Sequence, residues 1–266
     1  MNHAPKNPAV LSYYTMRRAV GIIAVTLPFA LASGSMLAAV IGPLHTLPQP
    51  LVERSISDYY YTPMRDYYVG SLFAIGAFLA CSRGYDHRDE ITGYLAGAFA
   101  FIVALVPDVN PYHHVHNAFH ENLGRIHLVA ASLMFLVLAY FCLVLFRKSH
   151  PGRPITRHKR HRNRVYLACG VVIVACMSCM LPLAYKPLHN LLWPSGILFW
   201  CESLALMAFG VAWLVKGEVF LRDKPHNHVN QAGASQEHHP LESALPGAAP
   251  FHSPLESAPA AQHHSE

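Results

Sequence analysis

Charged residues are scarce in this sequence. Asp, Glu, Lys and Arg make up 13% of its 266 residues, against about 25% in an ordinary soluble domain, whereas hydrophobic residues make up 53%. So little charge excludes a surface that faces water on all sides. The apolar residues also fall in long blocks separated by short polar stretches, as they do in membrane proteins. The composition therefore predicts an integral membrane protein.

The motifs of soluble metal and redox enzymes are also missing. The chain contains no HExxH motif, and its six cysteines lie inside or at the edges of apolar blocks, which predicts no disulfide framework. Its one CxxC motif, Cys176 to Cys179, lies within an apolar block where nothing favours a thiolate, so we expect packing thiols. The formal charge of +5 does not indicate nucleic-acid binding, because the basic residues concentrate in one loop.

Six apolar blocks are candidates for membrane-spanning helices. A crossing helix needs about 20 residues, and the blocks cover 19–42, 67–82, 91–107, 125–146, 165–185 and 195–215. The second and third blocks are short and reach span length only if their helices begin in the preceding polar loops. Four spans with a re-entrant pair are the alternative. The predicted fold is all-α, a polytopic transmembrane helix bundle of about six spans.

The basic residues predict the orientation of this bundle. Positively charged loops stay on the cytoplasmic side. The loop between the fourth and fifth blocks carries Arg147, Lys148, Arg153, Arg157, Lys159, Arg160, Arg162 and Arg164. With six spans, the same side also receives Arg17, Arg18, Arg83, Arg88, Lys216, Arg222 and Lys224. We therefore expect a multi-pass protein of the plasma membrane, the inner membrane in a bacterium, with both termini in the cytoplasm.

The chain is predicted to contain three segments. Residues 1–16 form a cytoplasmic N-terminal segment, residues 17–220 form the six-helix transmembrane domain, and residues 221–266 form a cytoplasmic tail. The tail is rich in Pro, Ala, Ser, Gln and His and lacks apolar periodicity, which predicts disorder.

Three polar residues are predicted to line or stabilise a cavity on the extracytoplasmic side. Asp58 follows the first span, His127 lies just inside the fourth, and Glu202 lies inside the last. A carboxylate in hydrocarbon is costly, so Glu202 should face the bundle interior, stay protonated or pair, with His127 as a candidate partner. The alternatives are a polar clamp between helices for Glu202 and helix capping for Asp58.

The histidines before and within the fourth span suggest a metal site as a second hypothesis. His116, His120 and His127 share one face if that helix extends backwards into its loop. Neutral imidazoles bind zinc and other transition metals. Pro111 and Gly124 can interrupt the helix, and an exposed loop with a capping His127 is the alternative. Outside this hypothesis we expect no cofactor.

Three sequence features together resemble a known family. They are Ser55-Ile56-Ser57-Asp58 after the first span, His127-Leu128-Val129-Ala130-Ala131 opening the fourth, and Glu202 in the last. The pattern is similar to that of the Frag/DRAM/Sfk-type six-span membrane proteins and related bacterial families of unknown function. The resemblance covers roughly residues 17–218. It implies a membrane fold without fixing a reaction, and the remaining histidines and the long basic loop are not part of it.

These observations predict a non-enzymatic membrane protein. Its polar cavity at Asp58, His127 and Glu202 would recognise lipid or another membrane component, so the expected partners are membrane lipids and not nucleic acid. One alternative is a metal-dependent intramembrane lipid hydrolase with Glu202 or Asp108 as base. Another is a small proton- or cation-coupled transporter in which His127 and Glu202 form the relay.

Overall fold

The computed structural model describes residues 8–42, 52–82, 86–109, 118–149, 156–180 and 196–219. Within these ranges there is no strand, and the α-helices are α1 (Pro8–Ile41), α2 (Arg65–Ala80), α3 (His87–Leu105), α4 (Ala118–Leu143), α5 (Arg157–Met180) and α7 (Ile197–Lys216). Two short 3-10 helices accompany them, η1 (Ser57–Tyr61) and η2 (Leu145–Arg147). All these helices belong to the unit Met1–Asp223, and the second unit is Lys224–Glu266. The predicted disordered tail lies outside the described residues.

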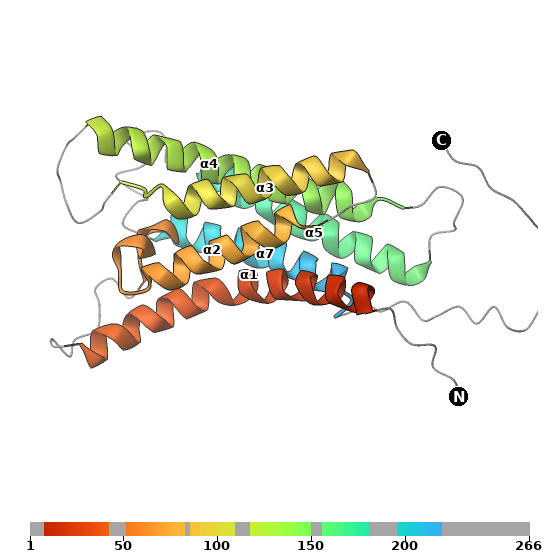
Figure 1. The fold of residues 1–266 in the computed structure, drawn as a ribbon, viewed down its shortest axis with the longest axis horizontal. Coiled ribbons are helices and arrows are strands. Elements are labelled where there is room, and N and C mark those ends of the chain that lie inside the picture. The colour runs from red at the N-terminus through yellow and green to blue at the C-terminus, as the bar shows by residue number, and fades with distance from the viewer. Residues whose placement is uncertain are drawn as a thin grey trace, which may run out of the picture. The chain divides into compact units, whose positions relative to one another are not determined.

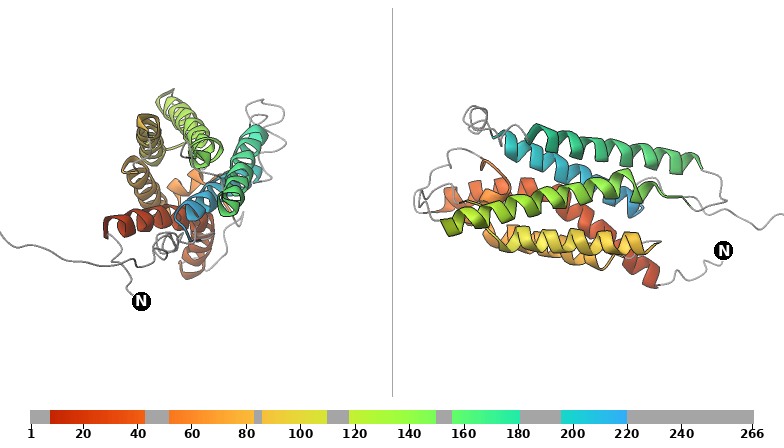
Figure 2. Two further views of the ribbon diagram at one scale, coloured as in Figure 1. Left: turned by 90° about the vertical axis from the view of Figure 1, so that its right-hand side faces the viewer. Right: turned by 90° about the horizontal axis from the view of Figure 1, so that it is seen from above.

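The six described α-helices form a closed bundle. They run alternately in opposite directions along the unit (Figure 1), and seen end-on they surround its centre (Figure 2). Each helix packs against the next in the order α1, α2, α3, α4, α5, α7, and α7 packs back against α1. This alternation brings the start of α2, the end of α3 and the starts of α4 and α7 to one end of the bundle.

Four of the described helices are long and apolar enough to cross a membrane: Tyr14–Ile41, Ala118–Arg147, Arg157–Met180 and Ile197–Lys216. This result confirms the predicted all-helical, membrane-type fold. The other two, α2 and α3, contain 16 and 19 residues. At 1.5 Å per residue they are about 24 and 28 Å long, against about 30 Å for the hydrocarbon core. Six crossings therefore stay a prediction.

The outer faces of the bundle are apolar. Large hydrophobic side chains with more than half of their surface exposed occur on α1, α4, α5 and α7, and they include Ile22, Phe29, Leu128, Leu136, Val171 and Leu204. The interior is also apolar, with Trp213, Phe209 and Tyr166 almost fully buried. A bundle that is hydrophobic both inside and outside is matched to lipid as its solvent.

Several helices begin before the apolar blocks that predict them. Helix α1 begins at Pro8, inside the predicted N-terminal segment, and proline is favoured at the first helical position. Helix α3 begins in the polar stretch before its apolar block, as expected, with Asp89 and Glu90 in its first turn. Because α4 begins at Ala118, His127 lies well inside the helix. His127 therefore does not cap α4.

Helices α2 and α3 approach each other closely at glycines. A Cβ atom added to Gly97 would lie 2.7 Å from the carbonyl oxygen of Gly76, and one added to Gly76 would lie 3.2 Å from the carbonyl oxygen of Gly97. Small residues allow such backbone contact between helices in a membrane, where the hydrophobic effect does not drive association. This contact holds the two shorter helices together as a pair.

We expect Gly97→Leu to force α2 and α3 apart. Overpacking of this kind costs about 1–3 kcal/mol and should lower the thermal unfolding midpoint of the detergent-purified protein by roughly 3–10 °C. Gly70→Leu on α2 is the matched control, because a Cβ atom there meets nothing within 4 Å. Equal midpoints for the two variants would contradict the close contact.

Candidate functional site

Residues 52–62 are folded against the start of α7. The backbone N–H of Ile56 donates a hydrogen bond to Oε2 of Glu202 at 2.7 Å, and the N–H of Phe199 donates to the carbonyl oxygen of Arg54 at 2.8 Å. The rings of Tyr59 and Phe199 pack with their centroids 6.1 Å apart. The first N–H groups of a helix have no partner within the helix, and here one of them binds this segment. We call residues 52–62 the docked segment.

Asp58 is buried within the docked segment and is only 2% exposed. Its backbone N–H donates to Oγ of Ser55 at 3.1 Å. The acceptor for this N–H is therefore the serine hydroxyl and not the Asp58 carboxyl. Carboxyl oxygen Oδ2 has no hydrogen-bond partner among the described residues. Burial, followed by the negative charges of Asp108 and Glu53, raises the pKa of Asp58 from 3.8 to about 7. Asp58 therefore titrates near neutral pH.

Two further carboxyl groups, of Glu202 and Asp108, lie at the same end of the bundle. Together with Asp58 they lie within electrostatic range of the Tyr68 hydroxyl on α2. Tyr68 is 1% exposed, and its hydroxyl makes no hydrogen bond in the described part of the chain. The hydroxyl of Tyr61 donates to the Asp108 carbonyl oxygen at 2.6 Å and links the docked segment to the end of α3. We call Asp58, Asp108 and Glu202 the acidic cluster.

His127 lies against the end of α3. Its Nδ1 atom is 2.6 Å from the carbonyl oxygen of Val106. Because a carbonyl only accepts hydrogen bonds, Nδ1 carries the hydrogen, and in a neutral ring Nε2 keeps its lone pair. Nε2 is buried and has no partner within the described ranges. One turn earlier on α4, a Cβ atom added to Gly124 would lie 3.3 Å from Oδ1 of Asp108, so both residues line the turn after α3.

The structure brings Asp58 within electrostatic range of Glu202 and places His127 against Val106, just after the end of α3. In the part of the chain that is described, no hydrogen bond or ion pair joins Glu202 to His127, so the suggested pair is not formed. Both side chains bind backbone groups instead. Tyr68 and Ser203 also lie here and are not predicted from the sequence; their buried hydroxyls have no partner in the same ranges. Their positions next to Tyr67 and Glu202 in the sequence gave no distinguishing signal.

The three predicted metal ligands are placed differently from one another. His116 lies outside the described residues, and His120 is exposed in the first turn of α4, with its ring centroid 5.7 Å from that of Phe119. His127 is buried and bonded to Val106. No group of three His, Cys, Asp or Glu side chains among the described residues is placed to hold a metal ion. The metal site stays a prediction.

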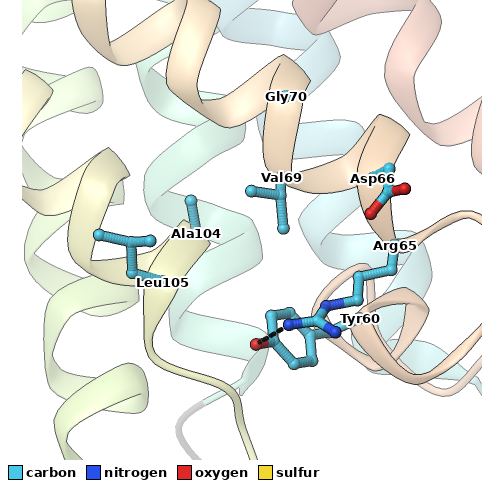
Figure 3. A pocket seen from close by; sticks show the side chains of 7 residues that line it. All are labelled: Tyr60, Arg65, Asp66, Val69, Gly70, Ala104 and Leu105. Carbon is cyan, nitrogen blue, oxygen red and sulfur yellow. Dashed lines mark hydrogen bonds between the residues drawn. The ribbon is translucent and has the colours of Figure 1, made fainter.

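A pocket of about 470 Å³ opens between the start of α2 and the end of α3 (Figure 3). It is lined by Tyr60, Arg65, Asp66, Val69, Gly70, Ala104 and Leu105. The Arg65 guanidinium lies over the Tyr60 ring, 4.3 Å from the centroid, and donates a hydrogen bond to the Tyr60 hydroxyl at 2.7 Å. The α3 side of the pocket is apolar. Tyr60 belongs to the docked segment and lies two positions after Asp58, so the docked segment forms one wall of this amphipathic pocket.

We expect Glu202→Leu to destabilise the protein more than Glu202→Gln. Both variants lose the carboxylate, but Gln keeps an oxygen that can accept the hydrogen bond from Ile56. Leaving that buried N–H without an acceptor costs about 1–3 kcal/mol, or roughly 3–10 °C in the thermal unfolding midpoint. Equal midpoints for the two variants would show that the hydrogen bond does not hold the docked segment.

We expect the stability of the protein to fall as the pH rises from about 4 to about 7. The folded protein binds the Asp58 proton more tightly than the unfolded chain does, so deprotonation in this window favours unfolding. Each unit of pKa difference corresponds to about 1.4 kcal/mol. Asp58→Asn should flatten the plot of unfolding midpoint against pH, and equal slopes for the variant and the natural protein would contradict the buried carboxyl.

Comparison of the chain with protein-family models, with curated proteins and with solved structures finds no match. The resemblance to the Frag/DRAM/Sfk-type proteins stays a prediction. The evidence on function therefore comes from the acidic cluster and the pocket at the start of α2.

Proposed function

We propose that this multi-pass membrane protein binds the headgroup of a zwitterionic phospholipid in the pocket between α2 and α3. One observation carries the proposal: the pocket combines a guanidinium, a carboxylate and an apolar wall at one end of a membrane-type helix bundle. This combination matches a headgroup that contains a phosphate and an amine next to apolar chains. Binding, without a chemical reaction, is the proposed activity.

Each part of the pocket has a counterpart in such a lipid. A guanidinium binds phosphate through parallel charge-assisted hydrogen bonds. One N–H of Arg65 donates to the Tyr60 hydroxyl, and the other N–H groups can donate to a ligand. The carboxylate of Asp66 suits the ammonium group. Val69, Ala104 and Leu105 offer an apolar wall to the glycerol and the upper acyl chains. Tyrosine rings such as that of Tyr60 favour the membrane interface.

The shortness of α2 supports this placement. We propose that α2 and α3 also cross the membrane, which gives six spans with both termini in the cytoplasm. A helix shorter than the hydrocarbon core is accommodated by local thinning of the bilayer. Thinning around α2 would bring lipid headgroups to the depth of Arg65 and Asp66, at the first two positions of the helix.

The acidic cluster is linked to the pocket through the docked segment. Glu202 fixes the docked segment through Ile56, and Tyr61 ties that segment to the end of α3, so Tyr60 is held at the pocket wall. We propose that Asp58, His127 and Glu202 stabilise this arrangement. The unpartnered Asp58 oxygen and His127 Nε2 are hydrogen-bond acceptors and suit an amine that enters more deeply.

We expect Gly70→Leu to block lipid binding without unfolding the protein. The new side chain points into open space in the pocket and should reduce the retention of phosphatidylethanolamine about tenfold or more, as measured by native mass spectrometry after lipid exchange in detergent. Ala77→Leu, two turns further along α2 and also exposed, is the matched control and should retain the lipid.

Two further measurements test whether the pocket binds the headgroup itself. Arg65→Gln should weaken phosphatidylethanolamine retention by about tenfold, because a charge-assisted hydrogen bond contributes about 1.5–3 kcal/mol. Diacylglycerol, which has the same chains and no phosphate or amine, should be retained poorly by every form of the protein. Equal retention by the Gly70→Leu and Ala77→Leu proteins, or of diacylglycerol and phosphatidylethanolamine, would overturn the proposed function.

A further inference from the structure

The hydroxyl of Tyr68 is a buried polar group that the pocket does not use. Tyr68 is 1% exposed on α2, and it is not one of the residues that line the pocket. Its hydroxyl has no hydrogen-bond partner among the described residues. The charged groups that act most strongly on this hydroxyl are Glu202, Asp108 and Asp58, in that order. The hydroxyl therefore faces the acidic cluster, and a buried polar group without a partner is costly.

A carboxyl oxygen of the acidic cluster is in the same situation. Asp58 is 2% exposed, and its Oδ2 atom makes no hydrogen bond within the described ranges. Repulsion from Asp108 on this carboxyl exceeds the attraction from Arg54. A buried carboxylate needs a hydrogen-bonded partner of opposite charge. A cation between the docked segment and α2 would supply this partner.

Two buried aromatic rings lie beside the cluster. Tyr59 follows Asp58 in the docked segment and is fully buried, and Phe199 lies one turn before Glu202 on α7 and is 2% exposed. Their ring centroids are 6.1 Å apart. The face of an aromatic ring attracts a cation, and organic ammonium ions are commonly bound where such rings and carboxylates occur together. The surroundings of the cluster therefore favour an organic cation.

The arrangement suits an ammonium ion better than a metal ion. A bound metal needs several ligand atoms at about 2.0–2.6 Å from one point. No group of three His, Cys, Asp or Glu side chains in the described part of the chain is placed in this way. A protonated primary amine carries three N–H donors that point in different directions. Such an ion can bond to acceptors that do not converge on one point.

We propose that the acidic cluster and the Tyr68 hydroxyl bind a protonated primary amine. Its N–H groups would donate to Oδ2 of Asp58 and to the hydroxyl oxygen of Tyr68, and the carboxyl groups of the cluster would offset its charge. A free alkylammonium ion and the ethanolamine group of a lipid share this chemistry. Because Tyr68 does not line the pocket between α2 and α3, the inference does not depend on lipid binding in that pocket.

The test makes one substitution at two neighbouring positions of the full chain. Tyr68→Phe removes only the buried hydroxyl, and Tyr67→Phe removes the same group from a residue that is 41% exposed. The measurement is the thermal unfolding midpoint of the detergent-purified protein in ethylammonium chloride. Tetramethylammonium chloride and potassium chloride at equal ionic strength are the reference salts. Tetramethylammonium has the same charge as ethylammonium but no N–H group.

At about ten times its Kd, ethylammonium should raise the midpoints of the natural protein and of Tyr67→Phe by roughly 3–6 °C more than either reference salt does. Tyr68→Phe should bind ethylammonium about tenfold more weakly, because a hydrogen bond from a charged donor is lost. Without ethylammonium, its midpoint should equal or exceed that of the natural protein, since an unpartnered hydroxyl has been removed. This comparison separates lost binding from lost folding. Equal shifts in the two variants, or equal shifts with ethylammonium and tetramethylammonium, would overturn the site.

The variant Gly70→Leu separates the two sources of the amine. An ethylammonium shift that is unchanged in Gly70→Leu would assign the site to a free ammonium ion. A shift that only phosphatidylethanolamine produces, and that Tyr68→Phe loses, would assign it to a lipid headgroup. Retention of phosphatidylethanolamine by Gly70→Leu would overturn the proposed pocket alone, whereas the absence of a shift with either amine would overturn this inference alone.

Discussion

The hydrogen bond from Ile56 to Glu202 is the interaction on which the candidate site depends. In a membrane, backbone groups outside helices must find partners within the protein, because lipid chains supply none. The docked segment meets this requirement at the start of α7, where Glu202 accepts one backbone hydrogen bond and Phe199 donates another. Fixing this short stretch sets the positions of Asp58, of Tyr60 and therefore of one wall of the pocket.

The two ends of the bundle carry different groups. At one end lie the carboxyl groups of the acidic cluster and the pocket lined by Arg65 and Asp66, one positive and one negative side chain. At the other end, Lys148 forms ion pairs with Asp86 and Asp89, and Arg18 donates a hydrogen bond to the carbonyl oxygen of Gly217 after α7.

The sequence was sufficient to predict an all-helical bundle of membrane type, because long hydrophobic blocks carry that information directly. It also brought Asp58 and Glu202 to one end. The sequence was not sufficient to predict the hydrogen-bond partners of the buried polar side chains. Glu202 binds the backbone N–H of Ile56, and His127 binds the backbone carbonyl of Val106. Every residue carries these backbone groups, so the sequence does not show which of them will bind a side chain. The pocket depends on how closely α2 and α3 pack at Gly76 and Gly97, which a sequence without a structure does not reveal.

The most direct test of the account links the Glu202 hydrogen bond to lipid binding. It measures phosphatidylethanolamine retention by the Glu202→Leu and Glu202→Gln proteins at a temperature where both are folded. Glu202 is not among the residues that line the pocket, so it affects the lipid only through the docked segment. The account predicts that the Gln protein retains the lipid and that the Leu protein loses it. Equal retention by the two folded proteins would contradict the claim that this hydrogen bond shapes the pocket.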